Sequence, residues 1–243
     1  MVVTNKDSGT NVTEIADGIY RISTPVSVDV IPGGFTFNQY LIVDDAPFLF
    51  HTGLRKMFPL VREAVASVIP VDRLRYLAFS HVEADECGAL NQWLAAAPGS
   101  VALCGRVAAS VSIEDLADRM PQEIGDGETL SLGRHTVRWF DTPHLPHAWE
   151  CGLMMEERTR TFLCGDLFTQ GGNNPAPLTE SDILGPSEAF RARMDYFSHS
   201  IRARAMLERL AATNPKTLAC MHGSAWHGDG AKILLALAGA LCE

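Results

Sequence analysis

The chain has 243 residues, of which 47% are hydrophobic and 20% are charged. This composition is typical of a globular protein and excludes a disordered or fibrous chain. Acidic residues outnumber basic ones by 29 to 20, and the resulting net charge of −9 makes nucleic acid and anionic membrane surfaces poor partners. The N-terminus lacks the features of a secretory signal, and the longest apolar tract, 233–242, is too short for a membrane span.

The cysteines indicate a reducing compartment. They form neither a CxxC pair nor the regular spacing of a small disulfide framework. We therefore expect a cytoplasmic protein with free thiols, several of them buried as small hydrophobic side chains. The six positions are Cys87, Cys104, Cys151, Cys164, Cys220 and Cys242.

The first half of the chain alternates between strand-like and helical patterns. Alternating or continuous apolar residues predict strands at 18–24, 39–44, 47–51, 74–79 and 101–104. Apolar residues at helical spacing predict a helix over 58–68. A second helix is expected to start near Asp85 and to end before Pro98.

The second half has the same mixed character. Strands are predicted at 128–132, 136–140, 152–155, 161–164 and 217–220. Glycine, asparagine and proline indicate a loop at 171–186, and a long helix is expected over 187–212, with another at the C-terminus. Because no linker or short repeat separates the halves, we expect a single domain over 1–243, in which two mixed sheets pack together with helices outside.

The segment after the strand at 74–79 is rich in metal-binding side chains. Four of them occur within six positions: His81, Glu83, Asp85 and Glu86. If the segment stays extended, His81, Glu83 and Asp85 point to the same side, and Glu86 points elsewhere unless the helix has already begun. The alternative interpretation is a polar loop that caps a helix.

Similar residues follow three further strands. His147 lies in the sequence Pro-His-Leu-Pro-His, Asp166 follows Leu-Cys-Gly, and His222 follows Ala-Cys-Met. Ligand-binding groups of α/β proteins tend to gather beyond the carboxyl ends of strands. Together with His81, a candidate ligand thus follows a strand four times. This recurrence favours a metal site over a capping loop.

The order HxExD, PH, GD and HG resembles the signature of the metallo-β-lactamase superfamily, HxHxDH followed by a His, an Asp and a final His. The resemblance spans nearly the whole chain and includes the strand that begins near Asn38 and the turn at Thr52 and Gly53. It implies an αββα sandwich with a two-metal site at one edge.

Glu83 stands where the hydrolases of this superfamily carry a second histidine. The pattern HxExD is similar to that of the flavodiiron proteins and of the oxygen-binding diiron proteins, in which O2 or NO binds between two non-haem irons. The resemblance therefore implies two iron ions as cofactors. It distributes the ligands as His81, Glu83 and His147 on the first iron, Asp85 and His222 on the second, and Asp166 between them.

Glu86 departs from the family pattern, because the family has a histidine there. Either Glu86 binds the second metal in its place, or it turns away and leaves a weaker or more open site.

The donor chemistry alone leaves alternatives. Carboxylates suit iron or manganese, whereas zinc sites are rich in histidine. We expect a protein that binds O2 and reduces O2 or NO when electrons are supplied. The alternatives are a metal-dependent hydrolase of an ester, thioester or phosphodiester, and a sensor without catalytic activity. No catalytic residue is assigned.

The source of electrons follows from the resemblance. Flavodiiron proteins carry a flavodoxin-like domain after the metal-binding domain, but this chain ends about 20 residues after His222. We therefore expect either a separate electron-donor protein or O2 binding without reduction. Dimers are common in the resembled family, so a homodimer is also expected.

Other histidines and two tryptophans are less informative. His51 is interpreted as a supporting or structural group near the site, and His135 and His199 as surface groups. Trp149 and Trp226 follow the expected ligands closely, so they either wall the site or pack in the core.

Overall fold

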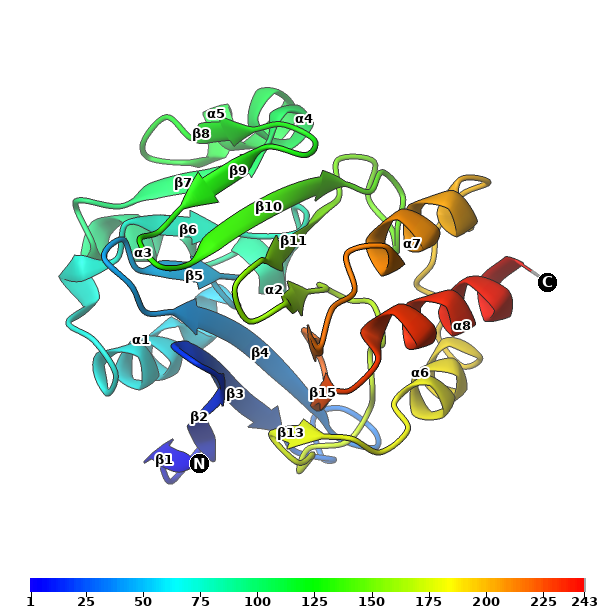
Figure 1. The fold of residues 1–243 in the computed structure, drawn as a ribbon. Coiled ribbons are helices and arrows are strands. Elements are labelled where there is room, and N and C mark those ends of the chain that lie inside the picture. Colours follow the sequence, from blue (N-terminus) through cyan, green and yellow to red (C-terminus); the bar gives the residue numbers. More distant parts are fainter. Residues whose placement is uncertain (243) are drawn as a thin grey trace.

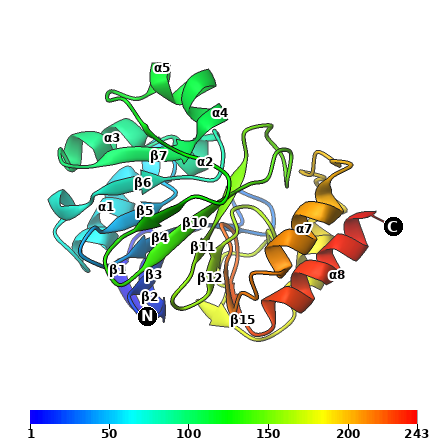
Figure 2. The same cartoon turned by 45° about the horizontal axis from the view of Figure 1, so that its top comes forward.

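Two mixed β-sheets pack face to face, and helices cover the outer face of each sheet (Figure 1). The computed structural model describes residues 1–242. In Figure 2 the layers follow one another: α1 (Phe58–Ala66) and α3 (Leu90–Ala96), the first sheet, the second sheet, and then α7 (Ala203–Ala211) and α8 (Gly230–Cys242). The predicted αββα sandwich is thus confirmed.

The first sheet contains the first eight strands in chain order. Its neighbours are antiparallel from β1 to β5 and parallel from β5 to β8. The strands are β1 (Val2–Asn5), β2 (Thr10–Ala16), β3 (Ile19–Val26), β4 (Phe35–Ile42), β5 (Phe48–Phe50), β6 (Tyr76–Ala78), β7 (Val101–Gly105) and β8 (Gln122–Ile124).

The second sheet has the order β13-β15-β14-β12-β11-β10-β9. β9 to β12 form an antiparallel meander, and β12 continues the sheet in parallel with β14. The strands are β9 (Thr129–Ser131), β10 (Thr136–Asp141), β11 (Gly152–Glu156), β12 (Thr161–Leu163), β13 (Leu178–Thr179), β14 (Thr217–Ala219) and β15 (Ala225–His227).

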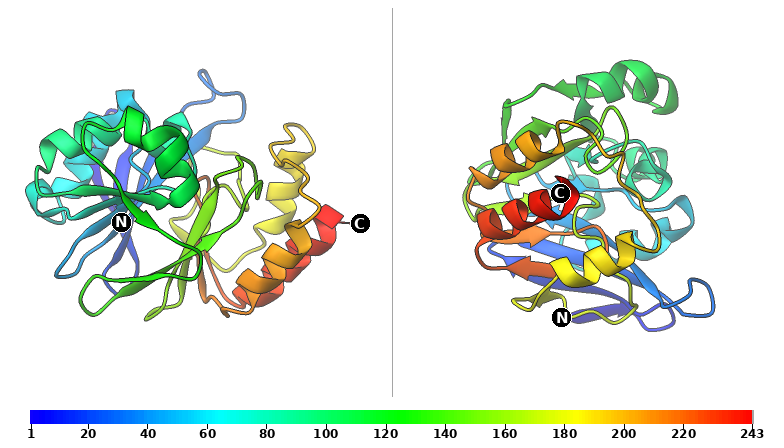
Figure 3. Two further views of the ribbon diagram at one scale, coloured as in Figure 1. Left: turned by 90° about the horizontal axis from the view of Figure 1, so that it is seen from above. Right: turned by 90° about the vertical axis from the view of Figure 1, so that its right-hand side faces the viewer.

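Shorter helices lie between these elements. α6 (Leu184–Arg191) lies near α7 and α8 on the outer side of the second sheet, as both views in Figure 3 show. The remaining helical segments are η1 (Arg55–Met57), η2 (Val71–Arg73), α2 (Ala84–Cys87), α4 (Arg106–Ala108), the π-helical turn η3 (Ala109–Ile113) and α5 (Glu114–Leu116). Among residues 1–242, no helix has the length and apolar character that crossing a bilayer requires.

The core between the sheets is formed by inward-facing side chains of both. Tyr40, Phe50, Trp139 and Met154 are all at most 1% exposed there. The cysteines are free, and Cys104, Cys151, Cys164 and Cys220 are buried, as predicted.

The predicted helix over 187–212 is wrong as one element. α6 ends at Arg191 and α7 begins at Ala203. The chain between them is not helical, because its backbone groups bind the loop that contains His147 instead of one another. Tyr196 O accepts a hydrogen bond from His147 Nδ1 at 2.8 Å, and Ser198 N donates to Pro146 O. Tertiary contacts outweigh helix propensity here.

Three smaller predictions also need correction. The helix near Asp85 is divided at Gly88 into α2 and α3, and the loop at 171–186 contains β13 and the start of α6. His135 is not a surface group, because it is fully buried with Nδ1 3.0 Å from Glu156 Oε1. Its pairing with a carboxylate twenty-one positions away in the sequence leaves no local signal.

Candidate metal centre

Side chains able to bind metal ions gather in two groups at the edge of the sandwich. The first group contains His81, Glu83, His147 and Asp166, and the second contains Asp85, Glu86 and His222. In each group the candidate ligand atoms lie within 4.8 Å of one another. The structure therefore brings together every candidate ligand that was named from the sequence.

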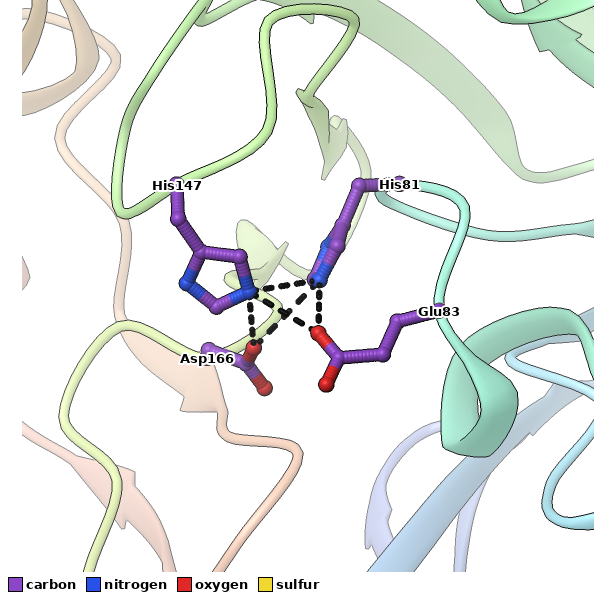
Figure 4. Close-up of side chains that lie close together, drawn as sticks. All are labelled: His81, Glu83, His147 and Asp166. Carbon is purple, nitrogen blue, oxygen red and sulfur yellow. Dashed lines mark hydrogen bonds and ion pairs between the residues drawn. The ribbon is translucent and has the colours of Figure 1, made fainter. Parts of the chain in front are cut away.

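The first group converges on one point (Figure 4). His147 Nε2 lies 2.9 Å from His81 Nε2 and 3.0 Å from Glu83 Oε2. His81 Nε2 is 3.1 Å from the same Glu83 oxygen. Asp166 Oδ2 completes the group at 3.4 Å from His147 and 3.6 Å from His81.

Asp166 faces both groups. Its Oδ2 atom lies with His81 and His147, whereas its Oδ1 atom lies 3.3 Å from His222 Nε2. His222 Nε2 is also 3.4 Å from Asp85 Oδ2. A carboxylate with one oxygen toward each group has the orientation that bridging of two metal ions requires.

The start of α2 separates Asp85 from Glu83. The backbone is extended at Glu83 (φ −138°, ψ 163°) and helical from Ala84 onward. The segment therefore does not stay extended, and the alternative in which the helix has already begun at Glu86 is the one that the structure shows. As a result Asp85 and Glu86, both in the first helical turn, join His222.

Two imidazoles are oriented by main-chain carbonyl groups. His147 Nδ1 donates to Tyr196 O and His222 Nδ1 donates to Thr36 O, both at 2.8 Å. A carbonyl oxygen accepts only, so the Nδ1 atom carries the proton. The Nε2 lone pair of the neutral ring is then directed into the cluster, as a metal ligand requires.

His81 is supported by side chains instead. Its Nδ1 atom lies 2.9 Å from Ser80 Oγ, and Ser80 Oγ lies 3.0 Å from His51 Nε2. Burial lowers the pKa of His51 to about 3, so this imidazole is neutral at physiological pH. Hydrogen bonds through Ser80 thus connect His51 with His81, in keeping with the interpretation of His51 as a supporting group.

Glu86 is a buried carboxylate without a hydrogen-bond partner. Its side chain is 0% exposed, and neither carboxylate oxygen has a hydrogen-bond partner among the described residues. Burial, followed by the nearby charge of Asp166, raises its pKa well above the ordinary value. Its Oε2 atom lies 3.9 Å from His81 Nε2, too far for a hydrogen bond. A buried carboxylate that receives no hydrogen bond is costly unless a cation compensates it. These orphaned oxygens, together with the buried Oδ1 of Asp166, fit a site for metal cations.

In the absence of metal ions, protonated imidazoles supply the positive charge. Burial lowers the pKa of His222, but the contacts with Asp166 and Asp85 outweigh it and raise the pKa to about 10. Hydrogen bonds from His147 and His81 lower the pKa of Glu83 to about 2. The carboxylates of the cluster thus stabilise positive charge, which protonated imidazoles or bound metal ions can supply.

The His222 loop is fixed by polar side chains of the first sheet. Asn38 Nδ2 donates to Cys220 O and to Gly223 O, both at 2.9 Å. The Tyr40 hydroxyl donates to Cys220 O at 2.6 Å, and the buried Arg21 guanidinium donates to Gly223 O at 2.8 Å. Sequence analysis did not identify these residues, although polar side chains inside otherwise apolar strands were the available signal.

Aromatic rings line one side of His222. The ring centroids of Phe35 and Phe37 lie 4.3 and 5.4 Å from that of His222. Trp149 is 58% exposed and Trp226 packs against the outer core of the second sheet. Phenylalanines of β4, which the sequence did not single out, thus cover this side.

Comparison with known proteins identifies a matching family. The family model described as "ODP family beta lactamase" matches residues 35–223. A rubredoxin-oxygen oxidoreductase of Megalodesulfovibrio gigas is 29% identical over 174 residues, which cover 70% of this chain and 42% of that protein. A putative diflavin flavoprotein A 1 of a Nostoc species is 30% identical over 141 residues, which cover 56% of this chain and 24% of that protein. The chain thus spans less than half the length of these relatives.

Solved structures share the fold. Rubredoxin oxygen:oxidoreductase from Desulfovibrio gigas superposes with a TM-score of 0.78 at 21% identity, over 94% of this chain and 62% of that one. The flavodiiron protein from Giardia intestinalis gives 0.80 at 17% identity, over 95% and 59%. At these identities the similarity concerns the fold alone.

We predict that Asn38→Ala destabilises the metal-free protein by roughly 1–3 kcal/mol, because two buried carbonyl groups each lose one side-chain donor, although Tyr40 and Arg21 still donate to them. Urea denaturation measures the free energy of unfolding. Asn91→Ala is the matched control, since Asn91 makes its hydrogen bonds at the surface, to Leu116 and Asp118, and should cost less than about 1 kcal/mol. Equal losses in the two variants would contradict the role assigned to Asn38.

Proposed function

Because the chain belongs to the ODP family of beta-lactamase-fold proteins, we propose that it is a non-haem diiron protein that binds O2. The observation that carries this proposal is the position of Asp166, with one carboxylate oxygen toward each group of candidate ligands. Bridging by such a carboxylate holds two metal ions roughly 3.5–4 Å apart. The resemblance of the HxExD pattern to that of the flavodiiron proteins supports iron as the metal.

The proposed ligands follow the two groups. His81, Glu83 and His147 hold the first iron, and Asp85 and His222 hold the second with Asp166 between them. Glu86 is proposed as a further ligand of the second iron, because its buried oxygens take part in no hydrogen bond within residues 1–242 and the ion-pair contact of Oε2 with His81 Nε2 is long, at 3.9 Å. Four carboxylates against three imidazoles favour iron or manganese over zinc.

The bound pair would supply a redox centre at which O2 or NO is taken up and, with electrons, reduced. The protein's own contribution is to hold the ligands and to limit access of water. The carbonyl groups that bind the Nδ1 atoms of His147 and His222 fix the imidazole planes. Phe35 and Phe37 cover His222 with apolar surface, which lowers the local dielectric constant around the site.

A separate protein is proposed as the electron donor. The name of the Megalodesulfovibrio gigas relative pairs rubredoxin with oxygen, which supports a separate protein as the donor. We also propose that residues 1–243 act as a single domain and that the protein forms a homodimer, as its resemblance to the flavodiiron proteins implies.

Metal content and reaction with O2 test the proposal together. Protein purified from iron-replete cells is expected to contain about two iron ions per chain, and its near-UV absorbance is expected to change when O2 is added to the reduced protein. About two zinc ions per chain with no O2-dependent absorbance would overturn it. Turnover of a chromogenic ester or phosphodiester that is lost in Asp166→Ala would instead support the hydrolase alternative.

Glu86→Gln is predicted to weaken the second metal equivalent by about tenfold or more, because an amide oxygen cannot compensate a cation as a carboxylate does. The first equivalent should be unchanged. Isothermal titration calorimetry of the metal-free protein with Fe(II) or Mn(II), under argon, measures the affinity of each metal equivalent separately. Glu123→Gln, at an exposed position in β8, is the control. If Glu86→Gln and the control bind both equivalents like the unmodified protein, Glu86 is not a ligand.

A further inference from the structure

We propose that a groove on the outer face of the second sheet binds a small anion that carries an apolar body. The groove has a volume of about 420 Å³, which lies within the range of small-molecule sites. The apolar residues that line it are Phe140, Met155 and Ala212, and the basic residues are Arg138, Arg160 and Arg209. None of these residues belongs to the candidate metal centre.

The alternation of β10 explains why the groove has both characters. Val137 and Trp139 point between the sheets, whereas Arg138 and Phe140 point to the outer side, where α7 and α8 lie (Figure 2). Met155, opposite Arg138 in the strand register, lies beside Phe140 in the outer core. Phe140 and Met155 are 6% and 4% exposed, so the floor of the groove offers a small apolar area between the arginines.

Neighbouring contacts hold two of the guanidinium groups in place. Arg138 binds Glu157 Oε1 through Nε at 2.7 Å and through its terminal nitrogen at 2.6 Å. Arg209 binds Asp126 at 2.6 Å, and its Cζ atom lies 5.0 Å from the centre of the Phe140 ring. Fixed guanidinium planes lose little conformational entropy when a ligand binds.

Arg160 provides the charge that is not compensated. Within residues 1–242 its side chain makes neither an ion pair nor a hydrogen bond, although it lines the same groove. The three guanidinium groups therefore face only two carboxylates, those of Glu157 and Asp126. A locally positive groove in a chain of net charge −9 favours an anionic ligand over a cation.

The groove thus fits a phosphate, carboxylate or sulfonate group beside Arg160, with an apolar or planar body against Phe140 and Met155. A guanidinium fork binds such oxyanions through paired hydrogen bonds. The same chemistry is offered by a soluble metabolite and by a lipid headgroup with its first methylene groups. The proposal is independent of the diiron function, because it involves no ligand of that site.

The test is fluorescence titration of the protein of residues 1–243 with 1-anilinonaphthalene-8-sulfonate, an anionic aromatic probe. We expect saturable binding that weakens about tenfold or more in Arg160→Gln, and that is lost in Ala212→Phe, which fills the groove without changing its charge. Arg158→Gln is the matched control, since Arg158 comes from the same hairpin but pairs with Asp17 outside the groove. Circular dichroism and thermal unfolding verify that each variant is folded.

Competition separates the two sources of ligand. Displacement of the probe by octyl phosphate, but not by phosphatidylglycerol vesicles, indicates a soluble ligand, whereas displacement by the vesicles indicates a lipid headgroup; either result supports the anion site. The proposal is overturned if Arg160→Gln and Ala212→Phe bind the probe as the Arg158→Gln control does, or if neither competitor displaces it.

Discussion

The constraint on which the site depends is the concentration of negative charge at one edge of the sandwich. Glu83, Asp85, Glu86 and Asp166 lie within two adjoining groups, and Glu86 and Asp166 are buried. Carboxylates so close together are stable as anions only beside compensating positive charge. Without metal ions the imidazoles provide it, as the raised pKa of His222 indicates. Metal ions would replace those protons, so that metal binding and proton release are coupled.

The architecture places these groups by using both sheets. Segments that follow β6, β12 and β14 deliver His81, Asp166 and His222, and the loop after β10 delivers His147. The second sheet alone does not fix the His222 loop. Polar side chains of β3 and β4, which belong to the first sheet, donate hydrogen bonds to the backbone carbonyl groups of this loop. The contact between the two sheets thus serves both the core and the geometry of the site.

Sequence analysis could find the candidate ligands because each follows a strand and each has a distinctive side chain. The residues that support them are harder to find, since Asn38 and Arg21 act on a loop about 180 residues or more away in the chain. Asp85 and Glu83 lie in different groups because the helix begins at Ala84. A helix that began one residue earlier or later would place these side chains differently, and a sequence pattern does not fix a helix start that closely. The break between α6 and α7 arises from contacts of Tyr196 and Ser198 with the His147 loop, which no local pattern encodes.

The central claim is that Asp166 bridges two iron ions, one in each group. The most direct measurement is an anomalous difference map at the iron absorption edge from crystals of the iron-loaded protein. The account predicts two peaks roughly 3.5–4 Å apart. One should lie beside His81, Glu83 and His147, the other beside Asp85 and His222, with Asp166 between them. A single peak, or two peaks that do not share Asp166, would contradict it.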